Sequence, residues 1–147
     1  MVAIGPGLGT HPDTAAFARR VVRELRVPAV LDADALNAFA GEPELLKDPP
    51  APRVITPHPG EMARLAGVST AEVQGNRVEV ARRMALEHRL FVILKGYRTL
   101  LATPQGQVWV NPTGNPGMAK GGTGDVLVGF IAGLLAQFAR QPLADVL

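Results

Sequence analysis

The chain has 147 residues, the length of one ordinary domain, and is 47% hydrophobic and 19% charged, so it can fold around a core. Its net charge of +2 gives little support to nucleic-acid binding. The absence of cysteine excludes disulfides, thiolate zinc sites and cysteine nucleophiles. No apolar stretch reaches the ~18 residues of a membrane span, and the first residues do not resemble a signal peptide, so we expect a cytoplasmic protein without membrane contact.

Short apolar runs alternate with longer helical stretches along the chain. Four runs that lead into glycine, proline or acidic residues are predicted as buried strands: 2–5, 29–31, 53–56 and 91–94. Helices are predicted at 10–25, at one or two places within 34–47, at 59–66, from 69 to about 89, and from 123 to about 139. Residues 99–103 and 107–110 alternate around a turn, which is typical of a hairpin. This order predicts an α/β fold with a mainly parallel sheet flanked by helices.

Two helix starts carry the spacing of a capping box, Thr10 with Asp13 and Ser69 with Glu72. Gly67 is predicted to end the helix over 59–66. The last predicted helix has a broad apolar face, made of Val126, Leu127, Phe130, Ile131, Leu134 and Leu135.

Four unusual loops follow the four predicted parallel strands. They are residues 5–9, 32–34, 56–61 and 95–96. Ligands of open α/β sheets bind beyond the carboxyl ends of the strands. We therefore expect these loops to converge on one rim and to form the functional site there.

The strongest local signal is the glycine-rich stretch 114–125, which leads directly into the last helix. Glycines let backbone amides approach a phosphate, and a helix N-terminus favours negative charge. Asp125 in the first turn would stay ionised and could accept a proton from a hydroxyl nucleophile. The alternative is a helix cap with a flexible loop. A Walker A site is excluded because Lys120 is followed by glycine.

Other candidates leave alternatives open. Residues 5–9 partly match a dinucleotide-binding fingerprint, but a tight strand-to-helix turn would look the same. Asp32 or Asp34 could bind a ribose, hold Mg²⁺ through water or cap the next helix. His58, between two prolines and near Glu61, could be a site residue or a loop histidine without a role. No zinc-site spacing and no nucleophilic serine elbow is present.

Five segments together resemble the ADP- or ATP-dependent NAD(P)H-hydrate dehydratases, which have a ribokinase-like fold. In chain order they read GPGLG (5–9), LDADALN (31–37), TPHPGEMARL (56–65), LKGYRT (94–99) and, within 111–127, GGTGD (121–125). The resemblance covers nearly the whole chain. It implies that a nucleotide phosphorylates the hydroxyl of hydrated NADH or NADPH, and that elimination of phosphate restores the nicotinamide ring.

The resemblance also implies roles for particular residues. Asp125 would be the catalytic base, and the amides of Gly122, Thr123 and Gly124 would form the anion hole. The nucleotide would be bound by Lys95, Gly96, Tyr97, Arg98, Thr99 and Gly124. The hydrate would contact Gly7, His58 and Asp125. ADP or ATP and Mg²⁺ are the implied cofactors, with a preference for ADP and no metal ligand assigned.

Domains of this family are longer than this chain. We therefore expect residues 1–147 to form a single partial domain, truncated at both ends, whose exposed faces favour a homo-oligomer. Three alternatives remain at this point: a ribokinase-like kinase for a vitamin precursor, a nucleotide-binding module without catalysis, and an inactive fragment that folds only against a partner.

Overall fold

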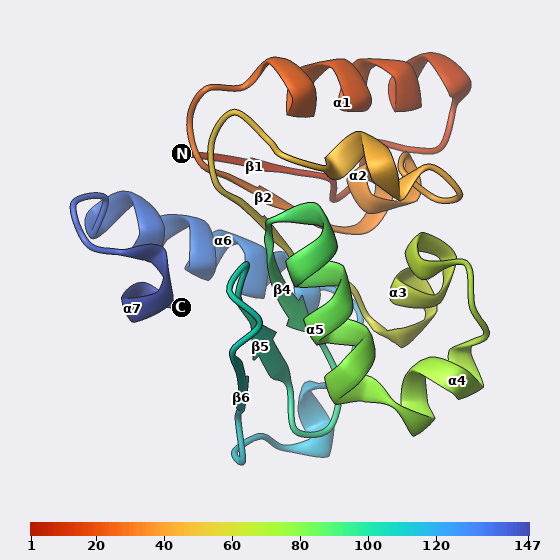
Figure 1. Cartoon of the computed structure of the whole chain (residues 1–147), viewed down its shortest axis with the longest axis vertical. Coiled ribbons are helices and arrows are strands. Elements are labelled where there is room, and N and C mark those ends of the chain that lie inside the picture. Colours follow the sequence, from red (N-terminus) through yellow and green to blue (C-terminus); the bar gives the residue numbers. More distant parts are fainter.

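The computed structural model describes residues 1–147, and all its strands join one sheet (Figure 1). In chain order, which is also their order in the sheet, the strands are β1 (Val2–Ile4), β2 (Ala29–Leu31), β3 (Arg53–Ile55), β4 (Phe91–Leu94), β5 (Leu100–Ala102) and β6 (Val108–Val110). Strands β1 to β4 are parallel, whereas β5 and β6 are antiparallel additions. The predicted mainly parallel sheet and its hairpin are confirmed.

Helices cover both faces of the sheet, because successive side chains of its inner strands point to opposite faces and so contribute to two cores. Val30 and Val54 face a smaller core with α6 (Thr123–Gln137), and Leu31 and Ile55 face the larger one. The larger core is covered by α1 (Pro12–Glu24), α2 (Ala33–Asn37), α3 (Pro59–Ala66), α4 (Thr70–Gly75) and α5 (Arg77–His88). Short 3₁₀ turns η1 (Pro43–Leu46) and η2 (Pro116–Met118), and the terminal α7 (Leu143–Val146), complete the chain.

Two helix predictions were wrong in detail. The predicted helix over 69–89 is broken at Asn76, whose φ of −134° is not helical, into α4 and α5. Glycine followed by asparagine is a weak place for a helix to continue. Helix α1 begins at Pro12 with His11 as its cap, rather than with a Thr10–Asp13 capping box. A proline is preorganised for the first helical position, so it fixes the start there.

Other helix ends agree with the prediction. Ser69 caps α4 as predicted, because its side chain accepts the Glu72 amide at 3.1 Å, but the Glu72 side chain does not bond back to complete the predicted capping box. Gly67 ends α3 in the left-handed conformation, with φ +67°. No helix of the chain is long and apolar enough to span a membrane.

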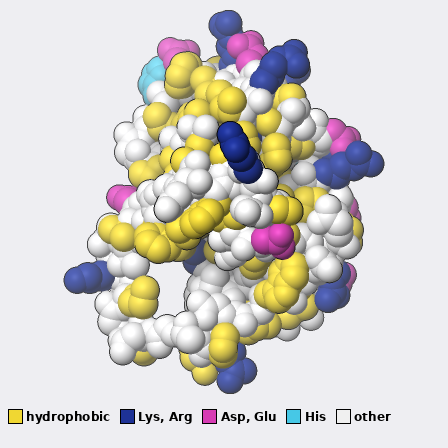
Figure 2. Space-filling view, turned by 90° about the vertical axis from the view of Figure 1, so that its left-hand side faces the viewer, with side chains coloured by type: hydrophobic (Ala, Val, Ile, Leu, Met, Phe, Trp, Pro, Cys, Tyr) yellow, Lys and Arg dark blue, Asp and Glu magenta, His cyan; other side chains and the backbone are white.

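The predicted apolar face of the last helix is only partly used. Val128, Ile131 and Leu135 of α6 are buried against the sheet, whereas Val126 and Phe130 are 73% and 65% exposed. Figure 2 shows a band of hydrophobic side chains on the face of the molecule that carries α6 and α7. A helix that is apolar on all sides normally lies inside a protein. This surface is therefore suited to contact with further polypeptide.

Candidate active site

The predicted convergence of the four loops on one rim is confirmed. Strands β1 to β4 run in the same direction, so the residues that follow them meet at their carboxyl ends. Backbone hydrogen bonds continue the ladder beyond the strands. The Asp32 amide donates to Ile4 at 3.1 Å, and the Lys95 amide donates to Pro57 at 2.9 Å. The loops are thus held side by side by the sheet itself.

The glycine loop after β1 is fitted closely to the loop after β2. Gly5 has φ +139°, and a Cβ there would lie 1.7 Å from the carbonyl oxygen of Asp32, so only glycine fits. The amide of Gly9 donates to Asp34 Oδ2 at 2.8 Å. Gly7, predicted to contact the hydrate, is exposed on this loop. Asp34 therefore orders the loop through its side chain.

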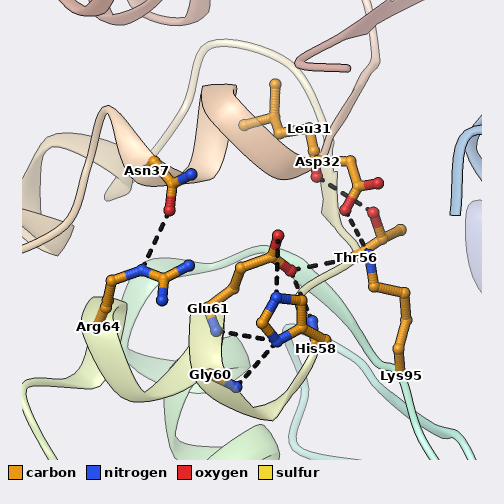
Figure 3. A network of polar contacts seen from close by, with 9 residues as sticks. All are labelled: Leu31, Asp32, Asn37, Thr56, His58, Gly60, Glu61, Arg64 and Lys95. Carbon is orange, nitrogen blue, oxygen red and sulfur yellow. Dashed lines mark hydrogen bonds and ion pairs between the residues drawn. The ribbon is translucent and has the colours of Figure 1, made fainter. Parts of the chain in front are cut away.

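A buried ion pair joins the second and fourth loops (Figure 3). Lys95 Nζ lies 2.7 Å from Asp32 Oδ1 and 3.7 Å from Glu61 Oε2. The side chains of Asp32 and Glu61 are only 2% and 7% exposed, and that of Lys95 is 20% exposed. Asp32 stands at the N-cap position of α2 but makes no capping bond, because its carboxylate binds Lys95 instead. The three groups together have a formal charge of −1.

His58 is the N-cap of α3, a role that the sequence analysis did not assign. Its Nδ1 accepts the amides of Gly60 and Glu61 at 3.0 and 3.3 Å, and Glu61 Oε2 accepts the His58 amide at 2.7 Å. These reciprocal bonds form a capping box. A neutral imidazole that accepts at Nδ1 carries its hydrogen on Nε2. The ring is about half exposed, so its outer edge faces solvent at the rim.

The N-terminus of α6 lies against the Lys95 ion pair. A Cβ placed on Gly124 would be 3.6 Å from Asp32 Oδ2 and 3.7 Å from Lys95 Nζ. The amide of Thr123 donates to Lys120 at 3.3 Å, whereas those of Gly122 and Gly124 donate to no backbone group. The structure thus places free amides and an ammonium group together, as an anion site requires.

Asp125 projects from the first turn of α6 and is exposed. The preceding residues 111–122 are also largely exposed, with only the short turn η2 inside them. No protein group contacts the Asp125 carboxylate through a hydrogen bond or ion pair, so it is available to a ligand.

The segment 95–99 is held by Arg77, a residue that sequence reasoning missed. Arg77 Nη2 donates to the carbonyls of Leu94 and Lys95 at 3.2 and 3.4 Å, and its burial lowers the pKa of the guanidinium. A Cβ on Gly96 would lie 2.6 Å from Arg77 Nη1. Arg77 lies 17 residues before Leu94 in the chain, and no sequence pattern links the two. They meet because the first turn of α5 packs beside the end of β4 in the folded chain.

The outer residues of this segment point away from the protein. Tyr97 is 84% exposed, with the Arg98 guanidinium 5.3 Å from its ring centroid. The Thr99 hydroxyl donates to the Gly96 carbonyl at 3.1 Å and so tightens the turn. Lys95 thus lies inside the site, whereas Tyr97 and Arg98 lie at its edge.

Hollows of about 220 and 310 Å³ lie away from the rim, where the ends of α1 and α5 meet η1, and no residue of the rim lines them. No group of three or more His, Cys, Asp or Glu side chains gathers to hold a metal ion. A metal ion at this rim would therefore need oxygen ligands from another molecule.

Nearly the whole chain is similar to known proteins. A family model described as NAD(P)H-hydrate dehydratase matches residues 1–146. The bifunctional NAD(P)H-hydrate repair enzyme of Moorella thermoacetica is 50% identical over 147 residues, which is all of this chain and 28% of that protein.

Solved structures show the same architecture. The ADP/ATP-dependent NAD(P)H-hydrate dehydratase from Bacillus subtilis, co-crystallized with ATP/Mg²⁺, has a TM-score of 0.79 and 41% identity, over 90% of this chain and 46% of its own. A ribokinase-like superfamily protein from Enterococcus faecalis has a TM-score of 0.74 and 31% identity, over 92% and 47%. The ribokinase-like fold is thereby confirmed. The chain spans about half the length of these structures and about a quarter of the bifunctional relative.

Proposed function

Because the chain belongs to the NAD(P)H-hydrate dehydratase family, we propose that it forms the nucleotide-binding and phosphoryl-transfer part of an ADP- or ATP-dependent NAD(P)H-hydrate dehydratase. The observation that carries this proposal is the contact between the N-terminus of α6 and Lys95. Gly124, with its free amide, lies beside the Lys95 ammonium. This combination is suited to the transferring phosphoryl group and lies next to Asp125.

In the proposed reaction, the segment 95–99 binds the nucleotide, and the amides around Gly124 stabilise the phosphoryl group. The hydroxyl that hydration added to the nicotinamide ring attacks the terminal phosphorus. Asp125 takes the hydroxyl proton, and the shortened nucleotide leaves. The phosphate ester then loses inorganic phosphate and a ring proton, which restores the double bond of NADH or NADPH. The exposed position of Asp125 supports this role, because a base must reach the substrate.

The hydrate would lie between the glycine loop after β1 and the loop after β3. Gly7 is exposed on the first loop, and His58 presents the outer edge of its ring on the second. Because Nδ1 is used as a helix cap, Nε2 is the ring nitrogen that would donate to a substrate oxygen, in exchange for its 3.5 Å contact with Glu61 Oε1. Both residues are proposed to position the substrate rather than to react with it.

Mg²⁺ fits the carboxylates of this rim. It usually binds one or two protein carboxylates together with substrate phosphates. Asp32 and Glu61 are nearly buried carboxylates that share Lys95, and Asp32 Oδ2 lies 3.6 Å from the Cβ position of Gly124 at the α6 N-terminus. These two residues would hold the ion. When bound, Mg²⁺ neutralises the charge that develops on the phosphates.

The test starts from purified NADH hydrate, Mg²⁺ and either ADP or ATP, with recovery of NADH absorbance as the readout. Recovery with one nucleotide would support the proposal and identify the phosphoryl donor. A rise in melting temperature with nucleotide but no recovery would mean that the chain binds nucleotide without completing the reaction. If neither is seen with either nucleotide, the proposal is wrong.

We also propose that the protein acts in the cytoplasm as a homo-oligomer. The exposed apolar residues Val126 and Phe130 support association, and the cysteine-free sequence suits a reducing compartment. Sedimentation at two protein concentrations would test the association. A monomer at both concentrations would contradict it.

A further inference from the structure

The ammonium group of Lys95 occupies the space between the two carboxylates that would serve a divalent cation. Asp32 Oδ1 is 2.7 Å from Nζ, and Glu61 Oε2 is 3.7 Å from it. Each carboxylate thus turns one oxygen toward Lys95 (Figure 3). While Lys95 stays there, a second cation at the same oxygens meets a like charge at contact distance.

Lys95 is the only lysine or arginine paired with these carboxylates, although His58 Nε2 also lies 3.5 Å from Glu61 Oε1. The side chains of the nearest arginines have other partners: Arg77 binds the carbonyls of Leu94 and Lys95, and Arg64 Nε binds Asn37 Oδ1 at 3.1 Å. Neither Asp32 nor Glu61 is paired with any arginine. Without Lys95, the nearly buried Asp32 would lose its ion-pair partner, and Glu61 would keep only His58, whose amide and ring contact its two oxygens.

Lys95 also has a second partner within reach if a nucleotide binds. Its Nζ lies 3.7 Å from the Cβ position of Gly124, beside the free amides of the α6 N-terminus. The lysine stem is long and flexible, and this side chain retains 20% exposure. A phosphate on those amides would therefore be close enough to draw the ammonium group away from Asp32.

We propose that Lys95 exchanges partners, from Asp32 and Glu61 in the free protein to a nucleotide phosphate in the complex, so that these carboxylates accept a divalent cation only together with the nucleotide. The part that concerns the nucleotide rests on the proposed function. The part that concerns the free protein rests on the ion pair alone. In the free protein, the Lys95 ammonium group excludes the metal ion from the carboxylates. In the complex, the ammonium group pairs with the phosphate and the metal ion pairs with the carboxylates, so every charged group keeps a partner of opposite charge.

The first experiment measures Mn²⁺ binding by calorimetry without any nucleotide. It compares the native chain, Lys95→Met and, as a matched control, Lys120→Met, since Lys120 is exposed and has no ion-pair partner. We expect Lys95→Met to bind Mn²⁺ at least about tenfold more tightly than the other two, because its carboxylates lack a counter-cation. The double variant Asp32→Asn/Lys95→Met should lose that gain. Equal Mn²⁺ affinity in the native chain and Lys95→Met would overturn the proposal.

The second experiment uses the native chain alone, so it does not depend on the folding of a variant. Mn²⁺ without nucleotide should leave the melting temperature unchanged, and Mn²⁺ with ADP should raise it. A rise with Mn²⁺ alone, as large as that with both, would overturn the exchange. If ADP has no effect while Lys95→Met still gains Mn²⁺, the proposed function fails but the exclusion of the metal by Lys95 stands.

Discussion

The two sides of the candidate site differ in how firmly the fold holds them. On the sheet side, Asp32 and Glu61 are nearly buried, and hydrogen bonds join the loops after β1, β2, β3 and β4 to one another. On the helix side, Asp125 and the glycine-rich residues before it are exposed and make few contacts. Nevertheless, both sides meet at Gly124.

The difference shows which functions each side can support alone. Buried, hydrogen-bonded loops are preorganised, so the sheet side needs little rearrangement to bind a ligand. The helix side has free amides and a free carboxylate, but it lacks surroundings that exclude water. The chain spans about half the length of the solved relatives.

The largest effect is expected on the helix side, at Asp125. Asp125→Asn removes the proposed base and should lower NADH recovery by about 10²–10⁴-fold, the usual contribution of a general base. Nucleotide affinity should change little, and so should the free energy of unfolding, because the side chain has no protein partner. Initial rates and calorimetric titration with ADP measure the two effects. Unchanged rates in the variant would show that another group takes the proton.

The next effect is expected at Arg53, the first residue of β3, at the end of the sheet opposite the loops. This side chain is fully buried, and its guanidinium donates to five carbonyls, those of Val22, Leu25, Val27, Ala51 and Pro52. Burial lowers the pKa of Arg53, yet an arginine remains protonated at neutral pH. Arg53→Met should lower the free energy of unfolding by about 3 kcal/mol or more, since several buried carbonyls lose their donor.

The control is Arg26, which lies in the connection between α1 and β2 whose carbonyls the Arg53 guanidinium binds. Arg26 is exposed and forms no ion pair. Arg26→Met should therefore change the free energy of unfolding by no more than about 0.5 kcal/mol. Denaturant titrations of both variants measure the contrast. Similar losses for the two would mean that the carbonyl cluster does not need the Arg53 guanidinium.

A smaller loss is expected where the glycine loop meets β2. Gly5→Ala places a methyl group 1.7 Å from the Asp32 carbonyl, so the loop must move, at a cost of about 2–3 kcal/mol. Gly7→Ala is the matched control, because its Cβ meets no atom within 4 Å and pays only for φ +75°. That cost is about 1 kcal/mol. Thermal unfolding of the two variants gives the comparison, and equal losses would show that crowding at Gly5 is unimportant.

Much of the sheet side could be predicted from the sequence. The bounds 29–31, 59–66 and 91–94 agree with β2, α3 and β4, because short apolar runs with glycine or proline at their ends have few other interpretations. The convergence of the loops followed from topology, since parallel strands bring their carboxyl ends to one edge.

The side-chain pairings could not be predicted in the same way. Asp32 and Lys95 are 63 residues apart, and each could have been a ligand, a cap or a surface charge. The Arg77 clamp likewise depends on which groups the folded chain brings together. The histidine caps at His11 and His58 are local bonds to amides two residues later, but histidine is not among the usual capping residues. Periodicity reports burial, whereas the choice of polar partner is decided by tertiary contacts.

The smallest effect on stability is expected at His58, where two variants separate its role as a helix cap from a role in substrate binding. Removing the ring in His58→Ala deletes the cap of α3, which should cost about 1 kcal/mol of unfolding free energy. His58→Asn keeps a side chain that caps helices well, so its stability should stay close to that of the native protein. Both variants lose the imidazole. If His58 positions the hydrate through Nε2, both should raise the KM for NADH hydrate by a similar factor, although only His58→Ala is less stable. A normal KM in His58→Asn would show that His58 serves only as the helix cap. The imidazole, and with it the loop after β3, would then take no part in substrate binding through this residue.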